Sequence, residues 1–406
     1  MKLLIANRGE IAIRIGQTAN ELGYTTVAVY PEDDSASLHV RQSDEAVLLP
    51  GSGAQAYLAI DEIIAAAKSI GATAIHPGYG FLSENPDFSQ ACEDADIVFV
   101  GPTPDQLSTF GNKAGARALA KKLKVPLVPG TNDDTSLEQV LKFWDQHPDM
   151  GIVVKAISGG GGRGMRIIES RDQIEKSYER CRSEARLAFG NDQVYVELLV
   201  PKARHIEVQV VGDGTGNVIH LWERDCSAQR QNQKIIEIAP SPNLPVTTRD
   251  ALLAASLEMA QDAGYRGVGT FEYLVNADNL DEFYFIETNA RLQVEHTVSE
   301  AITGLDLVAL QLNIAAGKTL PELGLTTAPQ YQGFAIQSRI NMETPGKKGL
   351  FNPTGGTISV FEPPSGPGIR VDTFGYTGYI TSPRYDSLLA KLIVHSTSGS
   401  FEVFSG

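Results

Sequence analysis

The stretch KAISGGGGRGMRIIE, residues 155–169, places a glycine-rich loop between two short β-rich segments. Glycines lack a Cβ atom, so their backbone N–H groups can close around phosphate oxygens, and Lys155 adds a positive charge before the loop. A strand rather than a helix comes after the loop, and no Gly-Lys-Ser/Thr sequence follows, which excludes a Walker loop and a dinucleotide-binding turn. We therefore expect a strand, loop and strand that cover a phosphate. A plain flexible hairpin is the alternative that this loop alone leaves open.

The residues before this unit alternate short β-rich runs with helix-length segments. Such alternation predicts an open parallel α/β sheet for residues 1–112. The β-rich runs are 3–6, 25–30, 72–75 and 97–101, and the helical segments are 10–22 and 58–68. A helix over 113–123, followed by Pro126 and Pro129, then makes 113–130 a linker.

The glycine loop belongs to a small unit over residues 131–203, and a larger region follows it. In the small unit we expect strands at 152–156, 165–169 and 194–200, with helices at 137–146 and after Arg171. From 204 to 406, runs that alternate apolar and polar residues dominate, with helices at 247–263 and 297–317. This region reads as an α+β domain built on an antiparallel sheet.

The composition excludes several classes of function. The 406 residues are 42% hydrophobic and 20% charged, an ordinary balance for two or three globular domains. A net charge of -15 argues against binding to nucleic acid or an anionic membrane. No apolar run approaches the roughly 20 residues of a membrane span. The three cysteines lack metal-ligand spacing, so we expect reduced thiols and a cytoplasmic location.

Two carboxylates lie among large apolar residues, where a negative charge without a positive partner is costly. Glu272 and Glu287 lie in β-rich runs joined by the polar turn 276–282, so adjacent strands would bring both to one face, together with Asn289. Three oxygen ligands suit Mg²⁺, which can bridge phosphates, better than they suit zinc. The alternative is that arginines at the edge of the core pair with the two carboxylates.

The same run continues as NARLQVEH, residues 289–296. Arg291, Gln293 and Glu295 supply a cation, an amide and a carboxylate that could hold a small anion and deprotonate it beside a metal. A solvated loop between a strand and a helix is the alternative. Further basic residues are scattered, and their spacing alone does not assemble them: Lys113, His205, Lys234 and Arg339. No Ser-His-Asp order, GxSxG elbow or HExxH helix supports hydrolysis by those routes.

Several long motifs in order resemble biotin carboxylase, an ATP-grasp enzyme. Besides the glycine loop, they are IANRGEIA at 5–12, HPGYGFLSEN at 76–85, RHIEVQ at 204–209, ERDCS at 223–227 and the run 287–296. The resemblance extends from Met1 to about His395. It implies an N-terminal Rossmann-like domain at 1–112, an ATP-grasp lid at 131–203 and a C-terminal domain at 204–406 that carries the metals, with ATP between the last two.

The resemblance also implies which residues hold the nucleotide and its metal. Phosphate contacts are implied for Lys113, Lys155, Gly161, Gly162 and His205. Adenine contacts are implied for Glu197, Leu198, Leu199, Val200, Gln229 and Leu274. Contacts to Mg²⁺ or Mn²⁺, and through it to ATP, are implied for Glu272, Glu287 and Asn289. Asn232, in the order Gln231-Asn232-Gln233-Lys234, stands where the family usually has a histidine that contacts the nucleotide. We associate that asparagine with members similar to urea carboxylase.

The reaction implied is ATP-dependent activation of bicarbonate to carboxyphosphate, followed by carboxylation of biotin. Bicarbonate contacts are implied for Lys234, Arg291, Gln293 and Val294. Glu295 would deprotonate bicarbonate, and Arg339 would stabilise the charge that develops on the biotin ureido oxygen.

The partners follow from the same resemblance. There is no Ala-Met-Lys-Met-type biotinylation motif, so we expect biotin to arrive on a separate carrier domain or protein, with a carboxyltransferase elsewhere and a homodimeric assembly. The chain stops at Gly406, where family members usually continue, so we expect it to be truncated. Two rival readings are another ATP-grasp carboxylate-amine ligase and a non-catalytic dimerisation or assembly module. The charge set Lys234, Arg291, Glu295 and Arg339 argues against the module.

Overall fold

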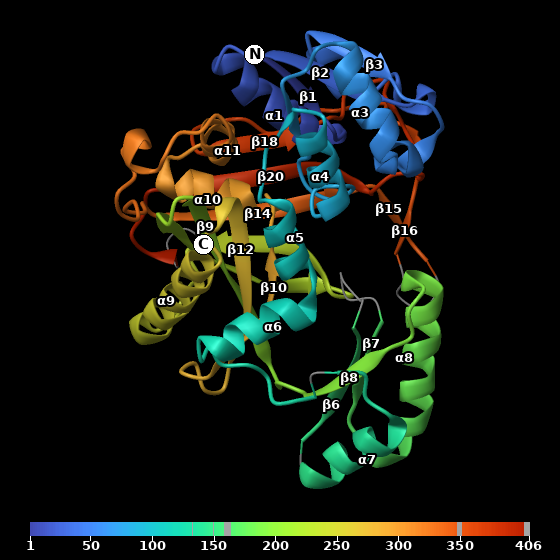
Figure 1. The fold of residues 1–406 in the computed structure, drawn as a ribbon, viewed down its shortest axis with the longest axis vertical. Helices are drawn as coiled ribbons and strands as arrows, with labels where there is room; N and C mark the ends of the chain where they lie inside the picture. Colours follow the sequence, from blue (N-terminus) through green and yellow to red (C-terminus); the bar gives the residue numbers. More distant parts are fainter. Residues whose placement is uncertain (132, 149, 158–163, 347–350, 402–406) are drawn as a thin grey trace.

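A computed structural model describes residues 1–131, 133–148, 150–157, 164–346 and 351–401. Three sheets organise this part of the chain, one in each of three successive regions of the sequence. The N-terminal region lies at the top of Figure 1, the largest sheet at the centre, and the region of the glycine loop at the lower right.

The N-terminal region is the predicted parallel α/β sheet. Its five strands run in the order β3-β2-β1-β4-β5, all parallel. They are β1 (Lys2–Ile5), β2 (Thr25–Tyr30), β3 (Glu45–Leu48), β4 (Ala74–His76) and β5 (Val98–Phe99). Its helices are α1 (Gly9–Glu21), α2 (Leu38–Gln42), α3 (Ile60–Ser69), α4 (Pro86–Asp94) and α5 (Pro104–Gly111), with 3-10 turns at Glu32–Asp34 and Gly53–Leu58. Strand β3 was not predicted, because this edge strand is mostly exposed and lacks the apolar run of a central strand.

Helix α6 (Lys113–Lys122) and the loop after it lead to a small antiparallel sheet of order β7-β6-β8. Its strands are β6 (Ile152–Ala156), β7 (Met165–Ile168) and β8 (Val194–Leu198). The helices α7 (Leu137–Gln146) and α8 (Ile174–Phe189) pack against it, with a 3-10 turn at Arg171–Gln173. All three strands were predicted, although β8 ends at Leu198, two residues before the predicted end at Val200. The expected phosphate contacts of Gly161 and Gly162 lie outside the described residues.

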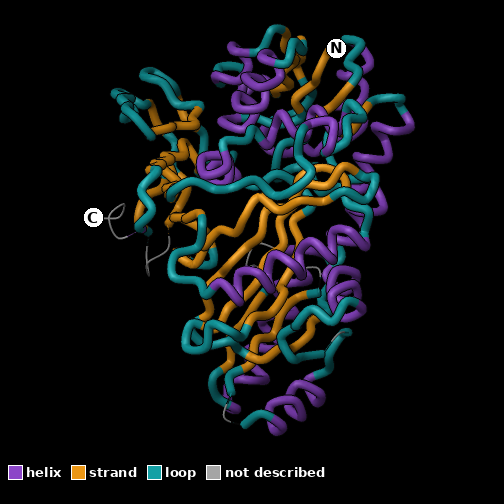
Figure 2. The backbone as a smooth tube through the Cα atoms, turned by 90° about the vertical axis from the view of Figure 1, so that its left-hand side faces the viewer, coloured by secondary structure: helices purple, strands orange, loops and turns teal. Residues whose placement is uncertain are grey.

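The third region contains an antiparallel sheet of eight strands, in the order β13-β12-β9-β10-β11-β14-β20-β18. The strands of this sheet are β9 (Ala203–Asp213), β10 (Val218–Arg230), β11 (Gln233–Ala239), β12 (Arg266–Asn276), β13 (Phe283–Asn289), β14 (Phe334–Asn341), β18 (Ile369–Thr373) and β20 (Leu388–Ser396). Two small strand pairs accompany it: β15 (Glu343–Pro345) with β16 (Phe351–Pro353), and β17 (Gly356–Thr357) with β19 (Ile380–Thr381). Figure 2 shows these strands as the band across the middle of the molecule, below the N-terminal helices.

One prediction for the helices of the third region was wrong. Helix α9 (Val246–Asp262) agrees with the prediction, but the single helix expected at 297–317 is two helices, α10 (His296–Thr303) and α11 (Leu307–Ala315), bent by 96°. Gly304 has φ +70° and ends α10, and the Asp306 side chain accepts from Ala309 N–H to begin α11. A short 3-10 turn follows at Pro321–Leu323.

No single helix of the described residues is long and apolar enough to cross a membrane, and the bent pair α10 and α11 is so only when its two helices are taken together.

Candidate active site

A cavity of about 1070 Å³ is lined by residues from all three sheet regions. Every described residue that the sequence analysis placed in the site contributes to its lining. These are Lys113, Lys155, Glu197, Leu198, Leu199, Val200, His205, Gln229, Asn232, Lys234, Glu272, Leu274, Glu287, Asn289, Arg291, Gln293, Val294, Glu295 and Arg339. Residues that are scattered over more than 200 positions of sequence therefore share one space.

The two predicted metal-ligating carboxylates face each other across neighbouring strands. Glu272 of β12 is the register partner of Glu287 of β13, and Asn289 lies two residues further along β13, opposite Thr270. Because side chains alternate along a strand, the three share one face, as predicted. Asn289 Nδ2 donates to Glu272 Oε1 at 2.8 Å.

Protein cations already compensate Glu272. Lys234 Nζ lies 2.9 Å from Glu272 Oε1, and His205 Nε2 lies 2.8 Å from Glu272 Oε2. Burial alone would raise the pKa of Glu272, but Lys234 and His205 hold it well below its ordinary value. The pKa of His205, which burial alone would lower, is raised by Glu272 in return. The alternative in which arginines pair with the two carboxylates is therefore wrong.

Glu287 is the uncompensated carboxylate. It has no hydrogen bond or ion pair with any described residue, and burial together with the neighbouring charge of Glu272 raises its pKa. Lys113, at the start of α6, lies near enough to oppose that shift, and its own pKa is lowered by burial. A half-buried carboxylate beside a second carboxylate and an amide oxygen fits a hard divalent cation such as Mg²⁺.

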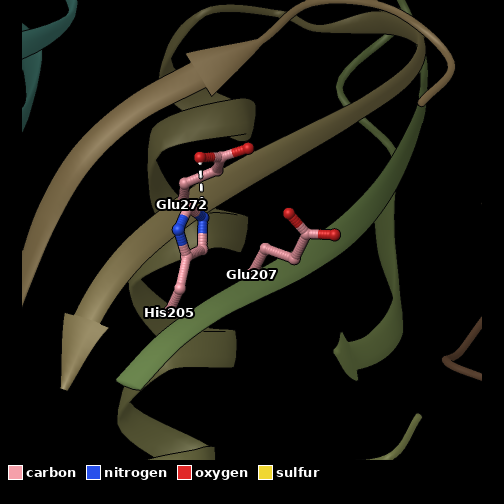
Figure 3. A group of neighbouring side chains, drawn as sticks. All are labelled: His205, Glu207 and Glu272. Carbon is pink, nitrogen blue, oxygen red and sulfur yellow. Dashed lines mark ion pairs between the residues drawn. The ribbon is translucent and has the colours of Figure 1, made fainter. Parts of the chain in front are cut away.

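Two other groups have potential ligand atoms within 4.8 Å of one another: His205, Glu207 and Glu272, and Glu207, Cys226 and Glu295. Figure 3 shows His205 and Glu207 rising from β9, with Glu272 of the neighbouring strand directed at His205. Glu207 already binds Arg224 at 2.6 Å and Lys234 at 2.6 Å. The oxygens of Glu272 are likewise paired, with Lys234 and His205, so what favours the set with Glu287 is one carboxylate that no cation of the described residues pairs with.

Lys234 is the centre of the charged cluster. Its ammonium group contacts Glu207, Glu272 and, at 2.7 Å, Glu295, and these three carboxylates raise its pKa well above the ordinary value in spite of burial. Glu295 also binds Arg339 at 3.0 Å. Burial favours the neutral acid, but Lys234 and Arg339 lower the pKa of Glu295 and keep it ionised.

Several members of this cluster were missed by the sequence analysis. Arg224 is fully buried and donates to Glu207, to Gln209 and, at 2.8 Å, to Gln293 Oε1. A signal existed, since His205, Glu207 and Gln209 alternate with apolar residues and must share one face of β9. Glu237, which binds Arg339 at 2.6 Å, gave a weaker signal of the same kind on β11.

The small sheet contributes a separate charged group. Lys155 of β6 and Arg117 of α6 both bind the buried carboxylate of Glu197 on β8. The chain then passes through Leu198 and Leu199, whose N–H groups donate to the carbonyl oxygens of Pro129 and Gly151 at 2.9 and 2.8 Å. These bonds fix the connection between the small sheet and the rest of the chain.

The turn that carries Asn232 is a tight hairpin. Gln231 and Asn232 join β10 to β11 with φ values of +52° and +63°, the conformation of a two-residue type I′ turn. Asparagine tolerates this left-handed backbone, which gives a local structural reason for its presence. The turn lies at the rim of the cavity.

Three family models match successive parts of the chain. Residues 1–107 match the N-terminal domain of biotin carboxylase, residues 112–323 the ATP-binding domain of the carbamoyl-phosphate synthase L chain, and residues 337–401 the C-terminal domain of biotin carboxylase. The chain belongs to the biotin carboxylase family. The predicted ATP-grasp fold and ATP-dependent ligase class are thereby confirmed.

Solved structures of biotin carboxylases agree with the whole fold. One is the biotin carboxylase domain dimer of the 2-oxoglutarate carboxylase from Hydrogenobacter thermophilus, in complex with MgADP, ADP and bicarbonate. It has a TM-score of 0.92 at 42% identity, covering 98% of this chain and 86% of that chain. A biotin carboxylase–beta-gamma-ATP complex from Campylobacter jejuni has a TM-score of 0.92 at 40% identity, covering 98% and 87%.

Curated relatives are longer proteins. Pyruvate carboxylase of Aspergillus niger is 48% identical over 396 residues, and mitochondrial pyruvate carboxylase of Rattus norvegicus is 48% identical over 400 residues. These matches cover 96% and 97% of this chain and 33% of each relative. The chain therefore spans about a third of the length of these relatives.

Proposed function

We propose that this biotin carboxylase domain uses ATP and bicarbonate to carboxylate biotin that a separate carrier domain delivers. One observation carries the proposal: Lys234 joins Glu272, a predicted metal ligand, to Glu295, a predicted base, within the same cavity. Activation of bicarbonate needs this proximity, because the anion must meet the terminal phosphate of a metal-bound nucleotide.

At the nucleotide end, Glu272, Glu287 and Asn289 would hold Mg²⁺, which neutralises charge on the ATP phosphates when bound. Lys113 and Lys155 would add positive charge around the phosphates. Lys155 must then exchange its ion pair with Glu197 for a phosphate contact. Further nucleotide contacts are proposed for Gly161, Gly162, Glu197, Leu198, Leu199, Val200, His205, Gln229, Asn232 and Leu274.

At the bicarbonate end, Lys234, Arg291, Gln293 and Val294 would hold the anion while Glu295 removes its proton. The carbonate oxygen then attacks the γ-phosphorus, the bond to the β-phosphate oxygen breaks, and ADP and carboxyphosphate form. In the present arrangement Lys234 and Arg339 lower the pKa of Glu295, so that it is ionised but weakly basic. Substrates that draw these cations away would raise its basicity.

At the biotin end, Arg339 would stabilise negative charge on the ureido oxygen while N1′ gives its proton to the leaving phosphate and accepts the carboxyl group. Arg339 is held by Glu237 and Glu295, with donors left for a ligand in the cavity. A closed, dry site is needed because carboxyphosphate is readily hydrolysed.

The proposed division of the chain is 1–112, 113–130, 131–203 and 204–406. The gap between the family models at 107 and 112 supports the first boundary, and the change from the small sheet to the large sheet between β8 and β9 supports the last. We also propose a homodimer that works with a biotin carrier and a carboxyltransferase, supported by the dimeric relative and the longer carboxylases. Three buried, free cysteines support a reducing, cytoplasmic compartment.

The test is ATP cleavage measured with purified full-length protein, Mg²⁺, bicarbonate and free biotin. We expect cleavage to require bicarbonate and to accelerate with biotin. Cleavage that needs a different acid and an amine would instead identify a carboxylate-amine ligase. ATP binding without cleavage under any of these conditions would favour the assembly module and contradict the proposal.

A further inference from the structure

Glu84 contacts the site from the N-terminal region. It lies between β4 and α4, and its two carboxylate oxygens accept hydrogen bonds from the β13 end of the large sheet. Oε1 accepts from Ala290 N–H at 3.2 Å and Oε2 accepts from Arg291 Nε–H at 2.8 Å. Arg291 lines the cavity, whereas Glu84 is not part of the lining formed by the described residues. Glu84 therefore binds Arg291 from outside the cavity lining.

The remaining donors of Arg291 are held by its own segment. Nη1 donates to the carbonyl oxygen of Leu292 at 3.2 Å, and Nη2 donates to Asn289 Oδ1 at 2.8 Å. Asn289 in turn donates to Glu272. Glu84 is the one carboxylate of the described chain that forms an ion pair with this guanidinium, and it reaches it across 207 positions of sequence.

The segment that carries Glu84 is itself held in place by hydrogen bonds. Asn7 Nδ2 donates to the carbonyl oxygens of Pro77 and Tyr79 at 2.7 and 2.8 Å, which ties the start of this segment to the end of β1. Immediately after Glu84, the Asn85 side chain caps α4. A carboxylate between two such anchors has little freedom to follow Arg291 if that side chain moves.

The electrostatics agree with this geometry. Burial alone would lower the pKa of Arg291, but the charge of Glu84, directly bonded to it, holds that pKa above its ordinary value. A guanidinium fixed at Nε keeps its plane, and so the direction of its terminal N–H groups, whereas a free one rotates about its long side chain.

We propose that Glu84 is a positioning residue that sets the orientation of Arg291 toward bicarbonate, so that the N-terminal region controls the geometry of anion binding. This role rests on the proposed function, in which Arg291 holds bicarbonate. Glu84 does not touch substrate; it acts through the backbone at Ala290 and through the Arg291 side chain.

The test begins with Glu84→Ala, Glu84→Gln and Glu84→Asp in the full-length protein. Misplacement of a binding group costs up to about a hundredfold, so we expect Glu84→Ala to raise the KM for bicarbonate by about tenfold or more. The KM for MgATP and the thermal midpoint should change little. Glu84→Gln should be intermediate, because it keeps an acceptor without charge, and Glu84→Asp should recover part of the affinity. Glu62→Gln, on an exposed position of α3, is the matched control.

A double-mutant cycle then separates positioning from a general structural role. If Glu84 acts through Arg291, adding Glu84→Ala to Arg291→Lys should change the bicarbonate KM less than about twofold. Equal effects in both backgrounds, or an unchanged bicarbonate KM in Glu84→Ala, would overturn the role of Glu84 alone. Lack of bicarbonate-dependent cleavage in the unsubstituted protein would overturn the proposed function and this role with it.

Discussion

Two buried charged clusters in this molecule differ in whether an unpaired carboxylate lies beside them. The site cluster consists of Glu207, Arg224, Lys234, Glu237, Glu272, Glu295 and Arg339. The distal cluster consists of Glu10, Arg14, Glu300, Asp306, Arg370, Asp372 and Lys391. In the distal cluster each carboxylate has a lysine or arginine within 3.0 Å. The same is true of the carboxylates of the site cluster, although one lysine serves three of them. The difference is Glu287, which lies beside the site cluster and has no cationic partner among the described residues.

Buried charge alone therefore does not mark a functional site. The distal cluster, whose carboxylates are all paired, ties elements together, as Lys391 of β20 does when it binds Glu10 of α1 and the carbonyl oxygen of Val294. Glu10 also borders the cavity, and burial raises its pKa to about 7, but it keeps its lysine partner. An unpaired carboxylate beside a cavity, such as Glu287, has charge left for a ligand. The following predictions test this distinction.

The largest effect is expected for the catalytic groups of the site cluster. Glu295→Gln removes the proposed base, and Arg339→Ala removes the cation proposed to stabilise charge on biotin. Loss of such groups costs about 10²- to 10⁴-fold, so biotin carboxylation should be nearly abolished in either variant, with the fold retained. Turnover is measured as biotin-dependent phosphate release, and circular dichroism checks the fold. Wild-type turnover would remove the role assigned to that residue.

The distal cluster should respond in stability. Lys391→Met leaves Glu10 buried without its cation, and breaking a buried pair in this way costs about 3–5 kcal/mol of unfolding free energy. Chemical denaturation measures the change. Lys122→Gln, which loses an exposed ion pair with Asp262, is the control and should move the midpoint little. A small effect of Lys391→Met would mean that the distal cluster does not hold the fold together.

Glu287 offers a sharper version of the comparison. Glu287→Gln removes charge from an uncompensated carboxylate, so we expect the folded protein to gain stability slightly while its affinity for Mg²⁺ with ATP falls by about 10- to 100-fold. Titration of Mn²⁺ in the presence of ATP provides a readout that does not depend on turnover. Equal affinity in the variant and the parent would exclude Glu287 as a ligand.

The smallest effect concerns acid stability outside the site cluster. Burial lowers the pKa of His39 to about 4, so the folded protein keeps it neutral while the unfolded chain protonates it near pH 6.5. Unfolding releases a site that binds protons, and stability is therefore lost as the pH falls from about 6.5 to about 4. His39→Gln should reduce that slope by up to about 1.4 kcal/mol per pH unit in denaturation at several pH values. An unchanged slope would show that His39 has the same pKa in the folded and unfolded states and that burial does not lower it.

The sequence predicted most of the elements but not all of their limits. Alternation of β-rich and helical runs identified the parallel sheet, because each such pattern is local. The edge strand β3 escaped detection because half-exposed side chains erase the apolar signal. The bend between α10 and α11 was missed because the apolar pattern continues on both sides of it. Gly304 and Asp306, which end one helix and begin the next, were too short an interruption to be recognised.

The candidate site, too, was predicted only in part. The shared face of Glu272, Glu287 and Asn289 followed from the alternation of side chains on two consecutive strands. The contact of Lys234 with Glu295 did not follow, because β11 and the segment after β13 are separated by several strands of the sheet order. Glu84 lies in the motif HPGYGFLSEN, but no pattern in the sequence connected it with Arg291, which is 207 positions away.

By itself, the sequence determined the residues of many helices and strands, the face that Glu272, Glu287 and Asn289 share and, through its motifs, the family. These properties depend on backbone geometry and on neighbours a few positions away. Only the tertiary structure decided that Lys234 is shared by three carboxylates, that Glu287 is left uncompensated and that Glu84 holds Arg291. Those facts are set by distances between residues far apart in the chain, and burial makes each such distance decisive for charge.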